Sequence, residues 1–260
     1  MASKARNDLI LGVISSLSSA MVAPDIGNVE GNRRVWDAYA KDWSPTADFV
    51  QSMSPQFSHP LAVLGDEWST PEDLHAVLDA YVYPYLAAGE SLHVGEIGSG
   101  GGRVSRIVAR QPTVSKYVCM DISAEMLAHA KKTLEDVPHV EFKHLPRAWP
   151  AATSLDFVIV FDVMVHMDLH TIHQTLQQIH RLLKPGGHCF LSTANLLAPK
   201  GWERFEKQSK FSIGGFYFLC PQMVDFLVVQ NGFTIALRSQ PRGDNMYENR
   251  DYLVVIQKPV

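Results

Sequence analysis

The chain has 260 residues, of which 46% are hydrophobic, and a formal net charge of −4. This composition is typical of a globular protein with a sizeable core. The chain lacks the strong positive charge that general nucleic-acid binding requires. No run reaches the roughly 18 consecutive apolar residues of a membrane-spanning helix. Three widely spaced cysteines, Cys119, Cys189 and Cys220, predict reduced thiols without a metal site. We therefore expect a cytoplasmic protein that binds a small molecule and does not bind membranes, nucleic acids or metal ions. Its oligomeric state stays open.

The first 23 residues allow two interpretations. Lys4 and Arg6 precede an apolar stretch at residues 9–17, and the small residues 18–20 resemble the cleavage site of a targeting peptide, but Asp8 interrupts that pattern. The alternative is an amphipathic cap helix or an unstructured leader. Both interpretations stay open.

Residues 1–90 are expected to form a helical cap or extension. Aromatic residues at helical spacing within residues 31–43 give that helix one aromatic face. Residues 44–70 are rich in proline, serine and threonine and predict an irregular connection. Thr70, followed by a proline and two acidic residues, predicts the start of a helix that continues to about residue 86.

Strands and helices alternate from residue 92 onward. Strands are expected at 92–97, 116–120, 140–143, 156–161, 188–193, 233–238 and 252–257, and helices at 103–110, 123–135, 169–183 and 221–230. Residues 184–187, Lys-Pro-Gly-Gly, are expected to end a helix. This alternation predicts a doubly wound α/β fold with right-handed crossovers.

Residues 94–103 combine an apolar strand, a cluster of glycines and the start of a helix, a pattern typical of a turn that binds a nucleotide-like ligand. In a doubly wound sheet such ligands bind beyond the carboxyl ends of the strands. A dinucleotide-binding turn, G-x-G-x-x-G, counted from Gly98 requires a glycine at position 103, where this chain has Arg103. The spacing therefore argues against an NAD-type oxidoreductase.

Three ordered motifs resemble those of the class I S-adenosylmethionine-dependent methyltransferases, small-molecule type. They are the E-x-G-x-G-x-G pattern from Glu96 to Gly102, Asp121 at the end of a strand, and L-K-P-G-G at 183–187. The resemblance covers residues 92–193 closely. It implies a mostly parallel seven-stranded sheet whose last strand is antiparallel, and a catalytic domain at 91–260. It also implies S-adenosylmethionine as cofactor, with S-adenosylhomocysteine as the product.

The resemblance further implies cofactor contacts at the ends of the strands. Asp121 would hold the ribose hydroxyls, Glu96 would lie near the methionine end or order the loop, and Asp162 would bind the cofactor's amino group or cap a loop. Apolar residues after Asp121 would flank the adenine. An acidic residue that many family members carry after the third strand is missing, so His144 or backbone atoms would replace it. The expected cofactor contacts are Glu96, Gly98, Ser99, Gly100, Gly102, Arg103, Asp121, Ile122, Met126, His144, Leu145, Phe161, Asp162 and Val163.

His166 is the candidate catalytic residue. Methyl transfer is an in-line displacement that needs an aligned, desolvated nucleophile and, for some acceptors, a base. His166 follows the strand at 156–161, and its neutral imidazole could accept a proton at pH 7. A purely structural role for this histidine is the alternative.

Substrate recognition is expected in the segments between the motifs. The insertion at 194–220 mixes cations with aromatic residues, so it predicts either a lid over an aromatic or anionic molecule or an amphipathic cover. The loop at 239–251 offers polar groups that could orient a substrate. The candidate substrate contacts are Trp36, Tyr39, Trp43, Trp68, His166, Trp202, Phe216 and Tyr247.

The sequence therefore predicts a methyltransferase that modifies an oxygen, nitrogen or sulfur atom of a small molecule. The N-P-P-Y and D-P-P-Y motifs of amide and adenine methylation are absent after the fourth expected strand, where residues 161–164 read Phe-Asp-Val-Met. A protein methyltransferase is one alternative. A non-catalytic, methyltransferase-like subunit that binds a partner through the aromatic insertion is the other.

Overall fold

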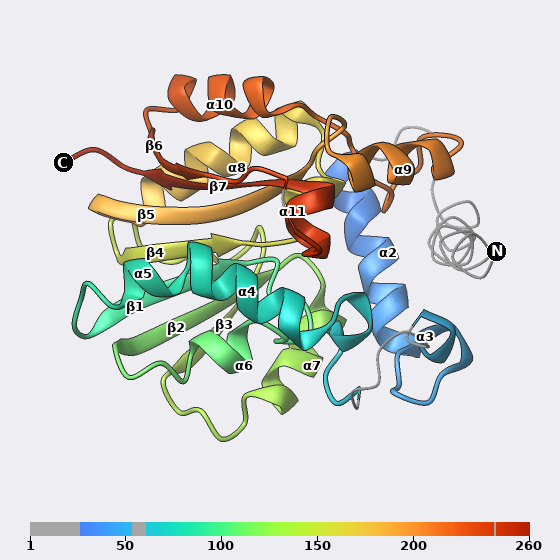
Figure 1. The fold of residues 1–260 in the computed structure, drawn as a ribbon. Helices are drawn as coiled ribbons and strands as arrows, with labels where there is room; N and C mark the ends of the chain where they lie inside the picture. The colour runs from blue at the N-terminus through green and yellow to red at the C-terminus, as the bar shows by residue number, and fades with distance from the viewer. Residues whose placement is uncertain (1–26, 54–60, 242) are drawn as a thin grey trace.

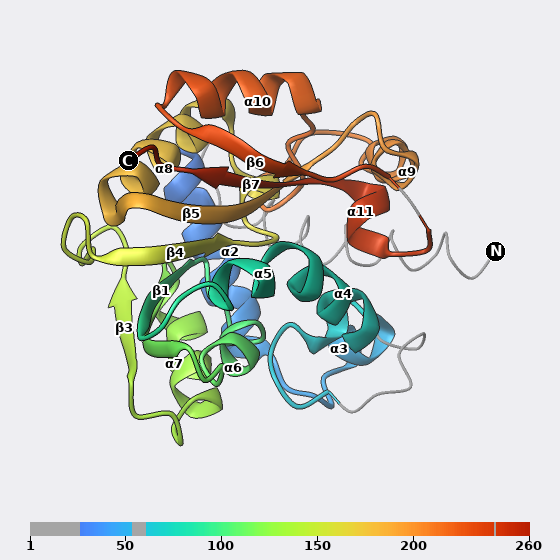
Figure 2. The same cartoon turned by 60° about the vertical axis from the view of Figure 1, so that its left-hand side comes forward.

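The computed structural model describes residues 27–53, 61–241 and 243–260. Its centre is a seven-stranded sheet of order β3-β2-β1-β4-β5-β7-β6 with helices on both faces (Figure 1, Figure 2). The strands are β1 (Leu92–Ile97), β2 (Val114–Asp121), β3 (Val140–His144), β4 (Leu155–Val160), β5 (Leu183–Ala194), β6 (Thr234–Arg238) and β7 (Asp251–Gln257). Strand β7 runs antiparallel to β5 and β6, and the other pairs are parallel. The expected α/β sheet, with its antiparallel last strand, is confirmed.

Helices precede β1 and fill most of the connections between the strands. They are α2 (Asn28–Asp42), α3 (Asp48–Met53), η1 (Asp66–Trp68), α4 (Pro71–Tyr81), α5 (Tyr83–Leu86), α6 (Ser105–Val108), α7 (Ala124–Thr133), η2 (Met164–His166), α8 (Leu169–Leu182), α9 (Pro199–Lys207), α10 (Pro221–Gln230) and α11 (Met246–Arg250). Side chains cap the starts of α4 and α7: Thr70 Oγ1 accepts a hydrogen bond from Asp73 N at 3.1 Å, and Ser123 Oγ accepts one from Met126 N at 3.0 Å. Each cap satisfies an otherwise unpaired N–H group.

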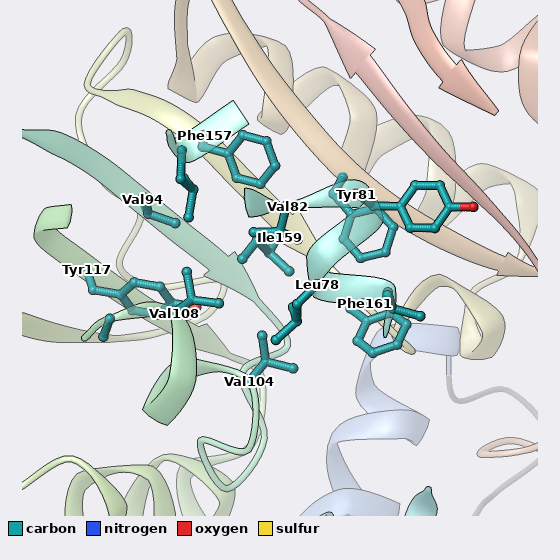
Figure 3. Packing of buried hydrophobic residues seen from close by; sticks show 14 of the residues in the cluster. Leu78, Tyr81, Val82, Val94, Val104, Val108, Tyr117, Phe157, Ile159 and Phe161 are labelled. Atoms are coloured by element: carbon teal, nitrogen blue, oxygen red, sulfur yellow. The ribbon is translucent and has the colours of Figure 1, made fainter. Parts of the chain in front are cut away.

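The core lies on both faces of the sheet because successive residues of a strand point to opposite sides. On one face, Phe157 and Ile159 of β4 belong to a buried cluster with Leu78 of α4 (Figure 3). On the other face, Val158 packs in a cluster with Leu176 of α8. Helices α4 and α5, which the sequence assigns to the N-terminal extension, therefore pack as a layer of the sheet domain.

Helix α2 crosses the carboxyl ends of the parallel strands (Figure 1). It is attached to α7 by Asp37 Oδ1, which accepts a hydrogen bond from Ser123 Oγ at 2.7 Å, and by the Ala40 carbonyl, which accepts one from His129 Nε2 at 2.9 Å. Tyr39 and Met126 meet in a small hydrophobic cluster between the two helices. The N-terminal helix thus covers the edge of the sheet at which a ligand is expected.

Three short helices lie in segments where the sequence predicts no helix: α3 in the irregular connection, α9 in the insertion and α11 in the late loop. Tertiary contacts explain two of them, because α9 and α11 pack on each other. A Cβ atom at Gly201 of α9 would lie 1.8 Å from the Asn195 carbonyl oxygen, so this approach depends on glycine. Such contacts between distant segments leave no periodic signal in the sequence.

The L-K-P-G-G run forms a bulge in β5 rather than only a helix stop. Leu183 pairs with Leu155 and His188 pairs with Phe157, so four residues of β5 oppose one residue of β4. Gly186 has a φ of +79°, which a glycine adopts without strain.

The sequence predicts no membrane-spanning helix, reduced cysteines and no metal site. Within the described ranges no helix is long and apolar enough to cross a membrane. The three cysteines have free thiols, and the described part of the chain holds no group of three or more potential metal ligands. The choice between leader and cap helix for residues 1–23 lies outside the described residues.

Candidate functional site

A cavity of about 500 Å³ opens at the carboxyl ends of β1, β2 and β4, beneath α2. Many of the residues expected from the sequence line it: Trp36, Trp68, Gly98, Gly100, Asp121, Ile122, Met126, Leu145, Phe161, Asp162, Val163, His166 and Phe216. Its volume lies in the range of small-molecule sites. The structure thus brings together residues from the glycine turn, the acidic strand end and the insertion.

The glycine turn explains how a ligand can approach the main chain. Gly98, Gly100 and Gly102 have φ values of +72°, +53° and +90°. A Cβ atom at Gly100 would meet no heavy atom within 4 Å, so this glycine faces the open cavity. A Cβ atom at Gly98 would instead lie 2.4 Å from Val163. Gly102 packs against Thr133 of α7 and does not line the cavity, so the structure does not bring it together with the other expected contacts.

Asp121 ties the glycine turn to the start of α7. Its Oδ2 accepts a hydrogen bond from Gly100 N at 2.9 Å, and its Oδ1 accepts one from Ser123 N at 2.8 Å. The side chain is buried, and this burial raises the pKa of Asp121 to about 6. Each carboxylate oxygen keeps a further acceptor site. The arrangement can therefore hold two hydroxyl groups of a ligand.

Glu96 orders the loop and does not line the cavity. Its Oε2 accepts hydrogen bonds from Ser105 Oγ and, at 2.6 Å, from Tyr117 Oη. Burial raises the pKa of this carboxyl to about 7. Of the two roles expected for Glu96, these hydrogen bonds favour the ordering of the loop, because they connect it to α6 and β2.

Replacing Glu96 with glutamine is expected to change how stability depends on pH. The folded-state pKa of Glu96 lies above its ordinary value of 4.5, so its contribution is complete below pH 4.5 and is lost as the pH rises through about 7. Urea unfolding should show wild type losing roughly 2 to 3 kcal/mol relative to Glu96→Gln between about pH 5 and about pH 8. Groups that do not interact with Glu96 titrate alike in both proteins and cancel in this difference. A difference that stays constant over this range would contradict the role of Glu96, and Glu125→Gln serves as the exposed control.

Arg103 does not line the cavity, so the structure does not bring it together with the other expected cofactor contacts. Its guanidinium is buried and donates to Ser69 Oγ at 2.9 Å and to Tyr247 Oη at 2.7 Å. These bonds also explain why Tyr247, a candidate substrate contact, is buried outside the cavity. Both side chains connect α11 to the segment before α4.

Further candidates have structural partners instead of cavity contacts. Tyr39 Oη and Trp43 Nε1 both donate to Glu67 Oε1, at 2.6 and 3.0 Å. His144 Nε2 donates to the Ile122 carbonyl at 3.0 Å, so it shapes the chain beside the cavity. Ser99 is buried behind the turn, and Trp202 is 48% exposed on α9. None of these five side chains is part of the cavity wall, so the structure separates them from the residues that line it.

His166 lies in the cavity wall as a neutral imidazole. Burial lowers the pKa of His166 to about 4, and its Nδ1 donates to the Gly215 carbonyl at 3.1 Å. Since a carbonyl only accepts, Nε2 carries the free lone pair. The ring packs edge-on against Trp36 and Phe216, at centroid distances of 5.0 and 5.3 Å. Its side chain can therefore accept a proton in a largely apolar environment.

The insertion and the late loop were expected near the substrate for their polar and cationic groups, but the arginines beside Phe216 and the asparagines of α2 are not among the individual contacts predicted from the sequence. Arg250 Nη2 donates to Asp162 Oδ1 and to Asp251 Oδ2, each at 2.6 Å. Burial opposes ionisation of Asp162, but Arg250 and other cations outweigh it and lower the pKa of Asp162. One oxygen of Asp162 is thus held by the protein. Arg204 also lines the cavity, with its guanidinium 4.7 Å from the centre of the Phe216 ring.

Asn28 and Asn32 attach α2 to the loop after β4. Their Nδ2 atoms donate to the carbonyl oxygen of His166 at 3.2 and 2.9 Å. In the sequence, the only indication of these contacts is that the two asparagines lie in or beside the expected aromatic helix. These two hydrogen bonds hold α2 over the cavity.

Comparisons with known proteins agree with this geometry. A family model described as a methyltransferase domain matches residues 96–189. The chain is 33% identical over 110 residues to a mitochondrial ubiquinone biosynthesis O-methyltransferase of Candida albicans, covering 40% of this chain and 33% of that protein. It is 32% identical over 112 residues to the ubiquinone biosynthesis O-methyltransferase of Cronobacter sakazakii, covering 41% and 44%. The matches thus span less than half the length of these relatives.

Among solved structures, the fold is similar to that of magnesium protoporphyrin IX methyltransferase from Synechocystis PCC 6803 with bound S-adenosylhomocysteine. The TM-score is 0.62 at 18% sequence identity, and the comparison covers 87% of this chain and 99% of that one. This likeness concerns the fold.

Proposed function

We propose that this chain, which belongs to the class I S-adenosylmethionine-dependent methyltransferases, transfers a methyl group from S-adenosylmethionine to a small molecule. The observation that carries the proposal is the buried carboxylate of Asp121, which is bonded to the glycine turn and lines a cavity of small-molecule size. An oxygen acceptor is favoured over nitrogen or sulfur, because two relatives are named as O-methyltransferases.

The residues present fit the cofactor. Gly100 leaves open space where a side chain would stand, and Asp121 offers acceptor sites for the two ribose hydroxyls. Ile122 and Leu145 line the cavity beside Asp121 and would flank the adenine. When bound, the cofactor supplies a methyl group on a sulfonium, and the electron pair of the broken bond stays on sulfur.

The protein's own contribution is alignment, exclusion of water and proton transfer. Trp36, Trp68 and Phe216 give the cavity aromatic walls, which strip water from an acceptor. Nε2 of His166 would take the proton that an acceptor hydroxyl loses as its oxygen forms the new bond to carbon. A covalent intermediate with the protein is not required.

A small acceptor fits the covered cavity better than a protein side chain. Helix α2 is held over the cavity by Asn32 and by the bond between Ser123 and Asp37. A protein acceptor would have to enter beneath this helix with its own backbone attached. The protein-methylating alternative therefore becomes an outcome of the test.

The test combines calorimetry with methyl-labelled cofactor. We expect the full chain to bind S-adenosylmethionine and S-adenosylhomocysteine, and to transfer label to a metabolite extract but not to protein extracts. Asp121→Asn, with its cofactor site damaged, serves as the inactive control. Label recovered only in protein would support a protein methyltransferase. Absence of cofactor binding would overturn the proposal in favour of a partner-binding subunit.

A further inference from the structure

We infer that the methyl acceptor carries an anionic group, such as a carboxylate, that Arg204 binds. The inference rests on the proposed function and adds the chemical class of the acceptor. Arg204 belongs to α9, which follows β5, and lines the cavity together with Phe216 and Arg250. Asp121 lies at the end of β2, so the arginine is on the other side of the sheet's centre from the expected ribose contacts.

Arg204 is a half-buried cation in the cavity wall. Its Nε is buried without a hydrogen-bond partner, and within the described ranges no carboxylate forms an ion pair with it. A buried N–H group without an acceptor is unfavourable, because it has lost its hydrogen bonds to water. A ligand that supplies the missing acceptor removes this cost.

Arg103 and Arg250 show the contrast. Arg103 is bonded to Ser69 and Tyr247, and Arg250 is bonded to Asp162 and Asp251. Both carboxylates near Arg204 are therefore already held by Arg250. Burial, followed by the neighbouring Arg250, lowers the pKa of Arg204 to about 10, which leaves it charged at neutral pH.

Phe216 connects this cation to the candidate base. The Arg204 guanidinium lies 4.7 Å from the centre of the Phe216 ring, and the His166 ring lies 5.3 Å from it, edge-on. A compact molecule can therefore place an anionic group at Arg204 and a hydroxyl at His166. Trp36 and Trp68 add aromatic walls to the same cavity, which suits an acceptor with a flat body.

The test compares carboxylates with their neutral amides. Calorimetry on the full chain, with and without saturating S-adenosylhomocysteine, would use benzoate, para-hydroxybenzoate and protocatechuate, each against its carboxamide. We expect wild type to bind the carboxylates about 10-fold or more tightly than the amides, as one charge-assisted hydrogen bond allows. Arg204→Gln should lose this preference, Arg204→Lys should keep part of it, and Lys200→Gln, an exposed cation of the same helix, should leave it unchanged.

Three results would overturn the inference: no preference for carboxylates in wild type, an unchanged preference in Arg204→Gln, or weaker S-adenosylmethionine binding by Arg204→Gln. The last would assign Arg204 to the carboxylate of the cofactor. Cofactor binding by wild type is measured in the same samples. Its failure would count against the proposed function, whereas a lost anion preference beside intact cofactor binding would count only against the role of Arg204.

Discussion

Replacing Asp121 with asparagine is expected to weaken S-adenosylmethionine binding about 100-fold, because charge-assisted hydrogen bonds contribute roughly 1.5 to 3 kcal/mol each. The carboxylate accepts from Gly100 N and Ser123 N and has acceptor sites left for the ribose. An amide has one oxygen, so its NH2 group must face one of these two N–H donors. The substitution thus removes a ligand contact and loosens the glycine turn together.

Calorimetry measures this effect, with Asp136→Asn as the matched control because Asp136 is exposed and pairs with Arg110. Wild type supplies a second measurement that does not depend on the variant's folding. Since burial raises the pKa of Asp121 to about 6, cofactor affinity should fall as the pH drops through about 6 and level off above it. Affinity that is flat from about pH 5 to about pH 8 in wild type would show that the ionised carboxylate is not the group that binds.

The glycine turn and its acidic partner could be predicted from sequence because they are local. Gly98 and Gly100 need positive φ values that other residues rarely adopt, and Asp121 directly ends a strand. Parallel strands bring such ends to one edge of the sheet, so the order of elements alone places them together. The same reasoning explains why His166, just beyond β4, lies in the cavity.

The direction of the Arg103 side chain could not be predicted from the sequence. Its position beside the glycines suggests a ligand contact, but the guanidinium bonds to Ser69 and Tyr247, which lie 34 and 144 residues away in the chain. Arg204 is the opposite case, because the chain after α9 folds back and Gln208, at the end of that helix, bonds to the main chain of Phe216, which brings the ring beside Arg204. Neither side chain's direction follows from a local pattern. Glycine turns and strand ends are set by the backbone, whereas long side chains are set by whatever acceptors the tertiary structure offers.

Replacing His166 with asparagine is expected to lower kcat by about 100-fold or more while leaving the Kd for S-adenosylmethionine unchanged, as the loss of a general base does. Asparagine can place its amide nitrogen near the position of Nδ1 and keep the bond to the Gly215 carbonyl, but it has no counterpart of Nε2. Glutamine makes the complementary change, because its amide reaches the Nε2 position and the Gly215 bond is lost. The measurement is initial-rate kinetics with the acceptor found in the labelling assay.

The two variants separate catalysis from structure. If His166 only fastens the insertion through Gly215, His166→Asn keeps nearly full turnover, and His166→Gln shows the larger loss together with lower thermal stability. If His166 is the base, both variants lose turnover and His166→Asn melts close to wild type. Near-normal kcat in His166→Asn would remove this residue from the chemistry.

The pH dependence of kcat tests His166 and Arg204 together. Burial is the main cause that lowers the pKa of His166 to about 4, and the cations Arg204 and Arg250 contribute to the lowering. A neutral base is available above its pKa, so turnover should fall only on the acid side. An anionic acceptor paired with Arg204 offsets one of these cations and raises the pKa of His166 in the complex. We therefore expect the acid limb of kcat at a higher pH than the titration of His166 observed by NMR in the free protein, and Arg204→Gln should bring the two closer together.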